Sequence, residues 1–366
     1  MNKSKLIAAV AAGAAALSLA VGKHLGILLI MCAIVVSCRA GRQGNDIEVE
    51  EILFESYKKT EAPLNESKMK WVETIELRDG GKADCAQMTV SKILWYGNRY
   101  WVLDTVQNTL VVYDDSGEAI ARVGIRGRGP QEYLKISDFT ITDRGEVVLL
   151  DGNQDVLIFY DHELKFIRKE KLKRDISRLM GLESGLYLMN ISSWETKGNE
   201  FKVILADEAQ TEQKGFIEND GLNDPNYEFP YIGFSGDAKD GIFFLKPIDD
   251  NVYLFDKNGL KTRYHFDFGV HTVKESYRKE IEKNQADVFA GTFLVNSVYV
   301  AKNYCLGMVF ERGNFYSFYL DKQSSLRYDL TSYGYFMGCN EGYAFFYVFD
   351  PMGKQEAIRI NKISFS

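Results

Sequence analysis

The sequence predicts an all-β fold in which one supersecondary unit is repeated, and two observations support this. A pattern of strand, short polar turn, strand ending in Asp, hairpin turn and strand occurs at Arg99–Gly124, at Glu146–Glu170 and, less regularly, at Gly241–Phe266. Aromatic residues make up 13% of the chain and there are six prolines, which suits many strands with aromatic packing between sheets. Repeats of about fifty residues built from short strands are typical of a β-propeller.

Six blades account for the chain from about residue 70 onward, because about 300 residues divided by a period of about fifty give six. Each blade is expected to be a small antiparallel sheet. We place the first two blades at Met88–Ile125 and Ile136–Leu172, and the other four begin near Ile176, Tyr231, Phe293 and Tyr335.

The last blade lacks an outer strand in this assignment. Trp71–Leu77 alternates like a strand and belongs to no other blade, so we expect it to close the ring at the edge of blade six. A different pattern occurs at Val273–Phe289, where Val273, Tyr277 and Ile281 form an apolar stripe among charged residues. This predicts one helix inserted between blades four and five, which either covers the ring or binds a partner.

Residues 1–37 are interpreted as a signal peptide. Lysines flank two short apolar runs, Leu6–Val21 and Leu25–Val36, and Ser37 and Cys38 follow the second run. Aliphatic and small residues before a cysteine indicate cleavage ahead of Cys38 and lipidation of its thiol; a plain secretory signal or an uncleaved anchor is the alternative. Residues 38–70 are expected to form a tether, with a short ordered stretch at Ile52–Tyr57, and residues 71–366 the propeller.

The charge of the chain excludes some classes of partner. Removing residues 1–37 takes away three lysines and no acidic residue, so the formal net charge changes from −7 to −10. Such a chain offers no basic surface for nucleic acid, and attachment to a membrane would depend on the lipid anchor alone. Cys85, Cys305 and Cys339 are odd in number and widely spaced, which favours buried free thiols over a disulfide.

One turn carries a resemblance to a known family. Gly127–Tyr133 reads G-R-G-P-Q-E-Y, and an I-S-D-F strand follows at Ile136. With these features, Gly124–Asp161 resembles the repeat of NHL-type proteins and, more closely, the six-bladed β-propeller lipoproteins of Bacteroidetes, in which Gly is usual at the position of Gln131. The resemblance implies an outer-membrane lipoprotein that faces the periplasm or the cell surface. It implies no activity, because that family has no established common one.

The sequence shows no catalytic motif. The mature chain keeps His162, His265 and His271 without partners at zinc spacing, and it has no G-x-S-x-G turn. We therefore expect no catalytic residue, no metal and no cofactor. The alternative is a Ca²⁺-dependent lactonase or lyase-type enzyme, with the ion held by carboxylates such as Asp104 and Asp151, although turn chemistry explains the same residues.

The candidate ligand-binding residues lie toward one face of the ring: Arg126, Arg128, Asp104, Asp151, Asn153, Gln154 and Trp194. The loops expected on that face are Thr105–Asn108, Gly152–Asp155, Ser192–Glu200, Pro247–Asn251, Glu311–Asn314 and Pro351–Lys354. The two arginines would either clamp an anion or brace loops through carboxylates such as Asp104 and Asp151. We expect a lipid-anchored, non-catalytic envelope protein that binds a peptide, a glycan or a protein through this face; a structural subunit of an uptake complex is a further alternative.

Overall fold

The structure is a computed structural model that describes residues 47–195, 200–219, 231–348 and 358–365. The chain divides into two compact units, residues 1–47 and 48–366, and the second unit holds the fold. The predicted signal peptide, Cys38 and the Pro351–Lys354 loop lie outside the described residues, as does part of the Ser192–Glu200 loop. None of the described helices is long and apolar enough to cross a membrane.

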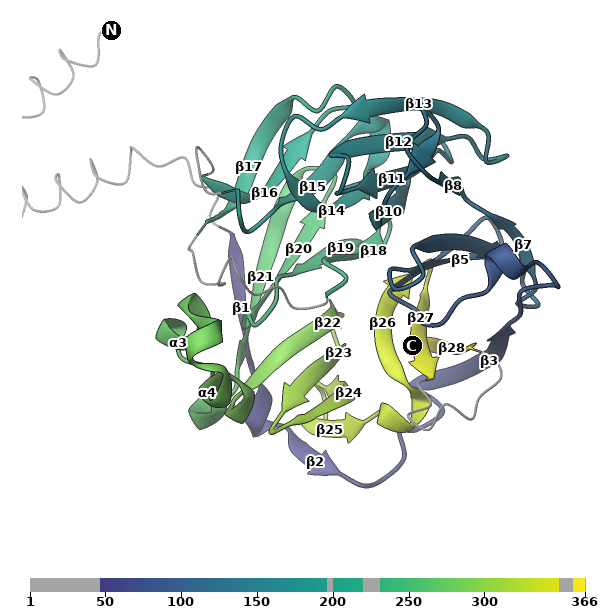
Figure 1. Ribbon diagram of the computed structural model, residues 1–366. Helices are drawn as coiled ribbons and strands as arrows, with labels where there is room; N and C mark the ends of the chain where they lie inside the picture. The colour runs from purple at the N-terminus through teal and green to yellow at the C-terminus, as the bar shows by residue number, and fades with distance from the viewer. Residues whose placement is uncertain (1–46, 196–199, 220–230, 349–357, 366) are drawn as a thin grey trace, which may run out of the picture. The chain divides into compact units, whose positions relative to one another are not determined.

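Six antiparallel sheets follow one another around a ring in chain order (Figure 1), which confirms the predicted six-bladed β-propeller. In each blade the first strand is innermost, and consecutive strands pair through short turns. Blade one consists of β4 (Lys92–Tyr96), β5 (Arg99–Asp104), β6 (Thr109–Tyr113) and β7 (Ala119–Arg122). Blade two consists of β10 (Ile136–Ile141), β11 (Val147–Asp151), β12 (Val156–Tyr160) and β13 (Phe166–Lys171). Blade three consists of β14 (Ile176–Gly181), β15 (Tyr187–Ile191), β16 (Phe201–Ala206) and β17 (Glu212–Glu218).

The remaining three blades follow the same plan. Blade four consists of β18 (Phe234–Asp237), β19 (Gly241–Leu245), β20 (Asn251–Asp256) and β21 (Gly259–Asp267). Blade five consists of β22 (Thr292–Val300), β23 (Tyr304–Glu311), β24 (Asn314–Asp321) and β25 (Leu326–Asp329). Blade six contains β26 (Tyr335–Asn340), β27 (Tyr343–Val348) and β28 (Ile358–Phe365). Short 3-10 turns occur at Phe54–Ser56, Ala83–Cys85, Glu183–Gly185, Gly269–His271 and Thr331–Tyr333.

Blade six is completed by β3 (Met69–Leu77), as the sequence predicts for Trp71–Leu77. The strand pairs antiparallel with β28, and Ile75 lies opposite Ile360 in the register. Both of these isoleucines are buried. The hydrogen-bonding edge of β28 is therefore covered by a strand that precedes the first blade in the sequence, and this contact closes the ring.

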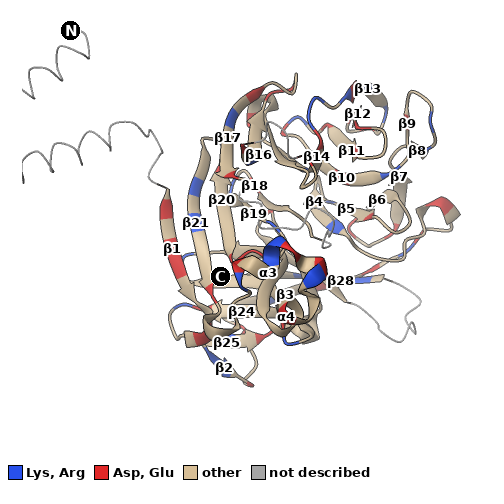
Figure 2. Ribbon diagram, turned by 60° about the vertical axis from the view of Figure 1, so that its left-hand side comes forward, with Lys and Arg blue, Asp and Glu red and all other residues tan. Residues whose placement is uncertain are grey.

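The structure differs from the expected tether over residues 38–70, because two strands lie within that range. β1 (Glu48–Leu53) pairs parallel with β21, and β2 (Lys58–Thr60) pairs parallel with β25, so blades four and five each gain a fifth, outer strand. The side chains of Ile52 and Phe54 are buried in the core, which holds this segment on the ring. Acidic residues mark β1 in Figure 2, and charge on an edge strand disfavours pairing with other chains.

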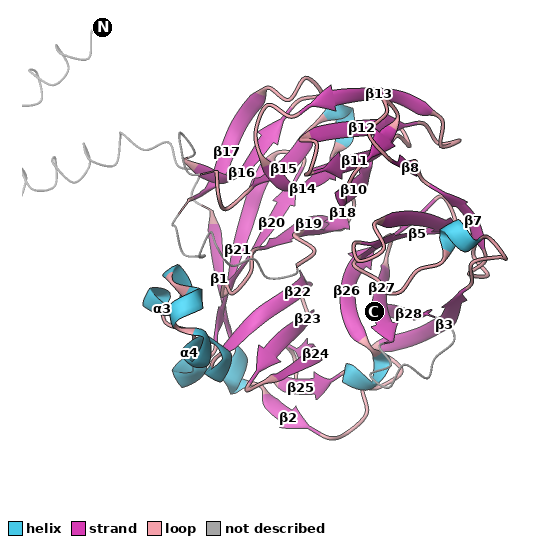
Figure 3. Ribbon diagram, in the orientation of Figure 1, coloured by secondary structure: helices cyan, strands magenta, loops and turns pink. Residues whose placement is uncertain are grey.

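The predicted helix at Val273–Phe289 is broken in two, as Figure 3 shows. α3 (Glu275–Lys279) and α4 (Gln285–Ala290) flank a 3-10 turn at Ile281–Lys283, and the backbone leaves helical angles at Glu280 (φ −136°, ψ 64°). The break allows Val273, Ile281 and Val288 to pack in one buried cluster with residues of blade five. The two short helices therefore cover part of the propeller.

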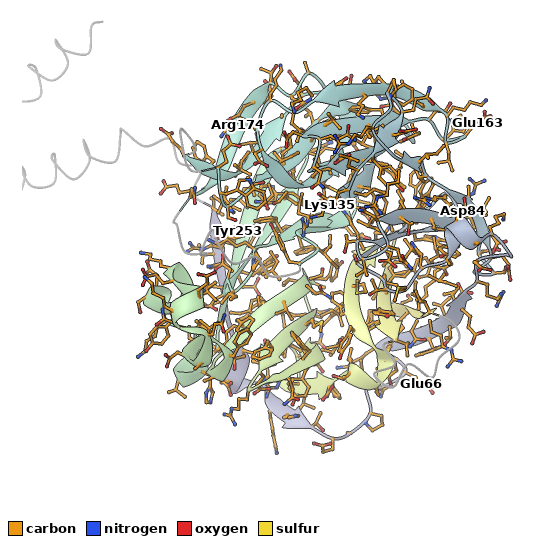
Figure 4. All side chains as sticks on the ribbon, viewed as in Figure 1. Glu66, Asp84, Lys135, Glu163, Arg174 and Tyr253 are labelled. Carbon is orange, nitrogen blue, oxygen red and sulfur yellow. The ribbon has the colours of Figure 1, made fainter. Side chains whose placement is uncertain are left out.

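The hydrophobic core lies between neighbouring blades, where side chains from both sheets interdigitate (Figure 4). Trp101 and Leu103 of blade one, for example, are in one cluster with Phe139 and Leu149 of blade two. Burial of each such side chain contributes about 1.5–3 kcal/mol. Among the described cysteines, Cys85 and Cys305 are buried, Cys339 is partly buried, and all three are free thiols.

Candidate functional site

Strand order assigns the loops that the sequence predicts as binding loops to one face of the ring. In an antiparallel blade, the turn between the second and third strands lies at the same end as the link to the next blade. We call this end the upper face; it carries the Thr105–Asn108 and Gly152–Asp155 loops and the links that contain Met88, Ile125 and Val270. The opposite end, with the turns between first and second strands, is called the lower face.

A cavity of about 390 Å³, here called the mouth cavity, opens at the centre of the upper face. The inner strands of several blades contribute to its wall, through residues such as Lys92, Asp138, Arg178 and Met337. Thr105 and Val106 of a predicted binding loop line it as well. The structure thus brings one of the expected loops to the cavity, although most of the polar lining comes from strands.

A buried ion pair crosses the wall of the mouth cavity. The Nζ atom of Lys92 donates to Oδ1 of Asp138 at 2.8 Å and to the carbonyl of Phe139 at 2.8 Å. Asp138 also accepts hydrogen bonds from the backbone N–H groups of Phe139 and Leu179, so this carboxylate links three blades. Burial lowers the pKa of Lys92, while the Asp138 carboxylate acts in the opposite direction.

Arg178 supplies a second positive charge to the cavity. Its guanidinium donates to the carbonyls of Tyr231, at 3.0 and 2.8 Å, and of Ser177, at 2.7 Å. The same group lies 4.4 Å from the centroid of the Tyr231 ring, in cation–π geometry. No described carboxylate forms an ion pair with Arg178. Since Lys92 and Asp138 compensate each other, the charged residues of the lining sum to one positive charge.

Hydroxyl groups and aromatic rings complete the lining. Ser91 Oγ lies 2.8 Å from Thr105 Oγ1, and Ser137 Oγ accepts a hydrogen bond from the Gly152 amide at 3.3 Å. Tyr335 and Tyr347 of blade six also line the cavity. A guanidinium, several hydroxyls and aromatic rings together suit a small anionic group such as a carboxylate.

Asp104 and Asp151 are fully buried, and their oxygens bind backbone amides. The Asp104 carboxylate accepts hydrogen bonds from four backbone N–H groups, those of Met88, Thr89, Val106 and Gln107. The Asp151 carboxylate accepts from the backbone N–H groups of Leu134, Lys135, Asn153 and Gln154 and from the side-chain amide of Gln154. Both carboxylates therefore tie their own loop to the preceding link. This is the turn chemistry described above, and a ligand or Ca²⁺ role for either residue stays a prediction.

Arg126 and Arg128 are exposed and make neither a hydrogen bond nor an ion pair with another described side chain. The bracing of loop carboxylates is thus not observed. Arg126 ends β8 (Ile125–Arg126), and Arg128 lies between β8 and β9 (Glu132–Tyr133); Figure 2 shows blue on the loop that carries these strands. The charge of this loop is available to a partner, at some distance from the mouth cavity, whose lining does not include it.

The carboxylate of Glu132 lies close to both glycines of this turn. The Gly129 amide donates to Glu132 Oε2 at 2.7 Å, and a Cβ atom on Gly127 would lie 2.0 Å from the same oxygen. Neither glycine adopts a positive φ. Glu132 therefore folds back onto the turn and holds its shape.

The other predicted residues are dispersed. Gln154 is bound by its neighbours, because its amide donates to the Glu132 carbonyl at 3.2 Å and accepts from Lys169 Nζ at 3.1 Å. Asn153 is exposed at the loop tip. Trp194 is half-exposed and donates through Nε1 to Asp175. These three residues share the upper face, but they do not line the mouth cavity.

The sequence reasoning missed Lys92, Asp138 and Arg178. The sequence did contain an indication, since each residue is the only charged one in a strand that is predicted to be innermost in its blade. Charged residues are rarely buried without a specific partner or role. Among the described residues, no group of three or more His, Cys, Asp or Glu side chains is placed to hold a metal ion.

The fold and this cavity define a six-bladed β-propeller with a charged, partly aromatic opening at the centre of one face. Residues 84–357 match the family described as "Domain of unknown function (DUF4934)". Because the match extends over most of the chain, the protein belongs to that family. No curated protein matches the chain.

Solved structures share the architecture. A protein of Bacteroides fragilis whose name describes it as exported superposes with a TM-score of 0.64 at 16% identity, over 87% of this chain and 99% of that one. A member of the duf4221 family from Bacteroides vulgatus gives 0.52 at 9% identity, over 82% of this chain and 100% of the other. At these identities the likeness concerns the fold. Virginiamycin B lyase from Staphylococcus aureus, at a TM-score of 0.43, 10% identity and coverage of 75% and 80%, is too distant to bear on activity.

Proposed function

We propose that this protein is an envelope protein, anchored by a lipid on Cys38, that binds a protein partner through the upper face and receives an acidic group of that partner in the mouth cavity. Arg178 carries this proposal. Its guanidinium is held rigidly by two backbone carbonyls and the Tyr231 ring, and no described carboxylate neutralises it. A positioned guanidinium with free charge favours a carboxylate ligand.

Exposed apolar side chains around the opening support a protein as the partner. Val106, at the edge of the mouth cavity, is 71% exposed, and Met88 and Ile125 on the neighbouring links are 66% and 69% exposed. Trp194 and Val270 lie on the same face. Apolar groups gathered on one face and mixed with polar ones are typical of protein–protein interaction sites.

Basic side chains would add long-range attraction for an acidic partner. Arg126 and Arg128 are exposed, and so is Lys135, which Figure 4 labels toward the middle of the ring. Charges on the rim of an interface mainly raise the rate of association and make it sensitive to salt. Binding by this face should therefore weaken as ionic strength rises.

Binding is favoured over turnover by the chemistry of the face. The metal-dependent alternative needs free carboxylates, whereas Asp104 and Asp151 accept several backbone hydrogen bonds each. The lipid anchor and a place in the outer membrane rest on the residue pattern before Cys38 and on the resemblance to propeller lipoproteins with NHL-like repeats.

The proposal is tested by photo-crosslinking in native membranes. A photoreactive amino acid at Val106 should yield a specific adduct with one envelope protein, and the same amino acid at His162, in a lower-face turn, should not. Arg178→Gln should reduce the adduct at unchanged melting temperature. Arg144→Gln is the matched control, because Arg144 is exposed and pairs with Glu208 away from the cavity. Equal adducts from both positions, or an adduct insensitive to Arg178→Gln, would contradict the proposal.

A further inference from the structure

A second cavity, of about 170 Å³, opens on the lower face between blades four, five and six. We call it the tyrosine cavity. Its wall includes Asp237 and Asp240, from the turn after β18, and the rings of Tyr299, Tyr304 and Tyr343. It opens on the face opposite to that of the mouth cavity, and the two share no lining residue.

The charge of this cavity is negative. Asp237 accepts backbone hydrogen bonds from Lys239, Asp240 and Glu341, which fixes the turn. The carboxylate of Asp240 makes no hydrogen bond and no ion pair with the described part of the chain, and the lining includes no Lys, Arg or His. Lys239, in the same turn, is exposed and likewise unpaired among the described residues. The pKa of the neighbouring Cys339 thiol is raised well above its usual value. Burial is the main cause, and the negative charges of Asp240 and Asp237 act in the same direction.

Tyrosine rings in the wall are a second feature, besides the carboxylates, that favours a cation in this cavity. Tyr299 and Tyr304 have centroids 6.3 Å apart and planes inclined by 33°, and Tyr304 stacks in turn on Tyr319 at 5.3 Å. Tyr343, of the adjacent blade, also lines the cavity, and Lys362 Nζ lies over its ring, 4.4 Å from the centroid. The electron-rich faces of aromatic rings attract ammonium groups, and the attraction grows when the site is shielded from water.

The same protein already contains a filled cage of this composition. The Nζ atom of Lys362 lies 3.6 Å from the Trp95 ring centroid, 4.4 Å from that of Tyr343 and 5.4 Å from that of Tyr100. Its charge is balanced by Glu73 at 3.3 Å. Tyr343 already contacts Lys362, so the aromatic and carboxylate components that the tyrosine cavity has for itself are Tyr299, Tyr304 and Asp240, and no Lys, Arg or His is among its described lining residues.

We propose that the tyrosine cavity is a binding site for a small alkylammonium group, held by cation–π contacts with Tyr299 and Tyr304 and by the charge of Asp240. A volume of 170 Å³ corresponds to about five or six water-sized groups at roughly 30 Å³ each, which matches an ammonium with its substituents. The ligand is a free amine or an amine side chain of another molecule. This site is separate from the proposed function of the upper face.

The test uses the purified full-length chain in detergent and isothermal titration with choline, n-butylammonium and N-acetyl-lysine methylamide. The neutral isostere of choline, 3,3-dimethylbutan-1-ol, is the control ligand. We expect saturable binding of at least one cation in the millimolar range and none of the neutral alcohol. Preference for choline or butylammonium would indicate a free amine, and preference for the lysine derivative an amine side chain.

Two variants connect the binding to this cavity. Asp240→Asn should weaken binding by about threefold to tenfold, and Tyr304→Leu by a similar factor. Asp115→Asn, which removes the same charge from an exposed lower-face turn of blade one, should leave the affinity unchanged. Melting temperatures would show whether Tyr304→Leu still folds, and Asp240→Asn alters only an exposed carboxylate. The absence of saturable binding by all three cations, or equal binding of the neutral alcohol, would overturn the proposal.

Discussion

Lys92 Nζ lies 2.8 Å from Asp138 Oδ1 across the boundary between blades one and two, and both side chains are almost completely buried. Two ions removed from water stabilise a fold only while each remains paired. The wall of the mouth cavity thus depends on residues that the ring itself brings together. The first prediction follows from this contact.

Lys92→Met should lower the free energy of unfolding by about 3–5 kcal/mol, because it leaves the Asp138 carboxylate buried without its cation. The double variant Lys92→Met/Asp138→Asn should recover part of that loss, since no uncompensated charge remains. Urea unfolding followed by tryptophan fluorescence measures both changes. Lys165→Met, at an exposed turn, serves as the control and should be nearly neutral. Equal stability of Lys92→Met and the control would contradict the proposed role of the pair.

A second prediction concerns pH and the attachment of the short helices. Arg278 of α3 forms a buried ion pair with Asp250, beside Asp249 and near His265. Burial raises the pKa of Asp250 to about 6, against the opposing effect of Arg278. The folded protein then binds this proton more tightly than the unfolded chain. The tighter binding of this proton stabilises the folded protein fully when the pH is below 3.8, the ordinary pKa of Asp. This stabilisation is lost as the pH rises through about 6, the pKa of Asp250 in the folded protein.

The measurement is the melting temperature of the protein and of Asp250→Asn from pH 4 to 7. The difference in stability between the two proteins should change by up to about 3 kcal/mol across that interval, because the variant lacks the titrating group. Asp256→Asn, at the partly buried end of β20 in the same blade, is the matched control for loss of a carboxylate. A constant difference for Asp250→Asn would show that the carboxylate does not titrate there.

A third prediction tests the place of the N-terminal strands. Phe54 is fully buried, and its ring is 5.1 Å from that of Phe268 and 5.3 Å from that of Phe318. Phe54→Ala should therefore cost about 3–5 kcal/mol, as expected for a core position. The neighbouring Leu53 is 52% exposed, and Leu53→Ala should change stability by less than about 0.5 kcal/mol. Similar small effects of both variants would mean that this segment is not part of the folded ring.

The fourth prediction concerns attachment to the envelope. If Cys38 carries the lipid, Cys38→Ser should move the protein from the membrane fraction to the soluble fraction, because acyl chains would be the main membrane contact of so acidic a chain. Fractionation followed by immunoblotting measures this, and mass spectrometry of the mature N-terminus identifies the modification. Cys85→Ser, at a buried thiol, controls for loss of a cysteine in general. A Cys38→Ser variant that stays in the membrane would contradict lipidation at this position.

Much of the architecture was predictable because its determinants are local. Alternating residues in Arg99–Gly124 and turn-forming Asp and Gly residues define strands and hairpins over a few positions. Trp71–Leu77 was recognisable as a closing strand for the same reason. The segment Glu48–Thr60 was not, because its strands are short and charged and only their pairing with β21 and β25 reveals them.

The chemistry of the two cavities was not predictable in this way. Asp138 lies 46 positions from Lys92, and Arg178 lies 53 positions from Tyr231, so each contact joins separate blades or links. The conspicuous Arg126 and Arg128 proved to lie outside the mouth cavity. The sequence by itself determined the number of blades, the inner strands of each blade and the closure of the ring, since these follow from a period of two and from local turn chemistry. Only the tertiary structure decided which charges face each other and which remain free, because closing the ring places inner strands from all parts of the chain around one axis.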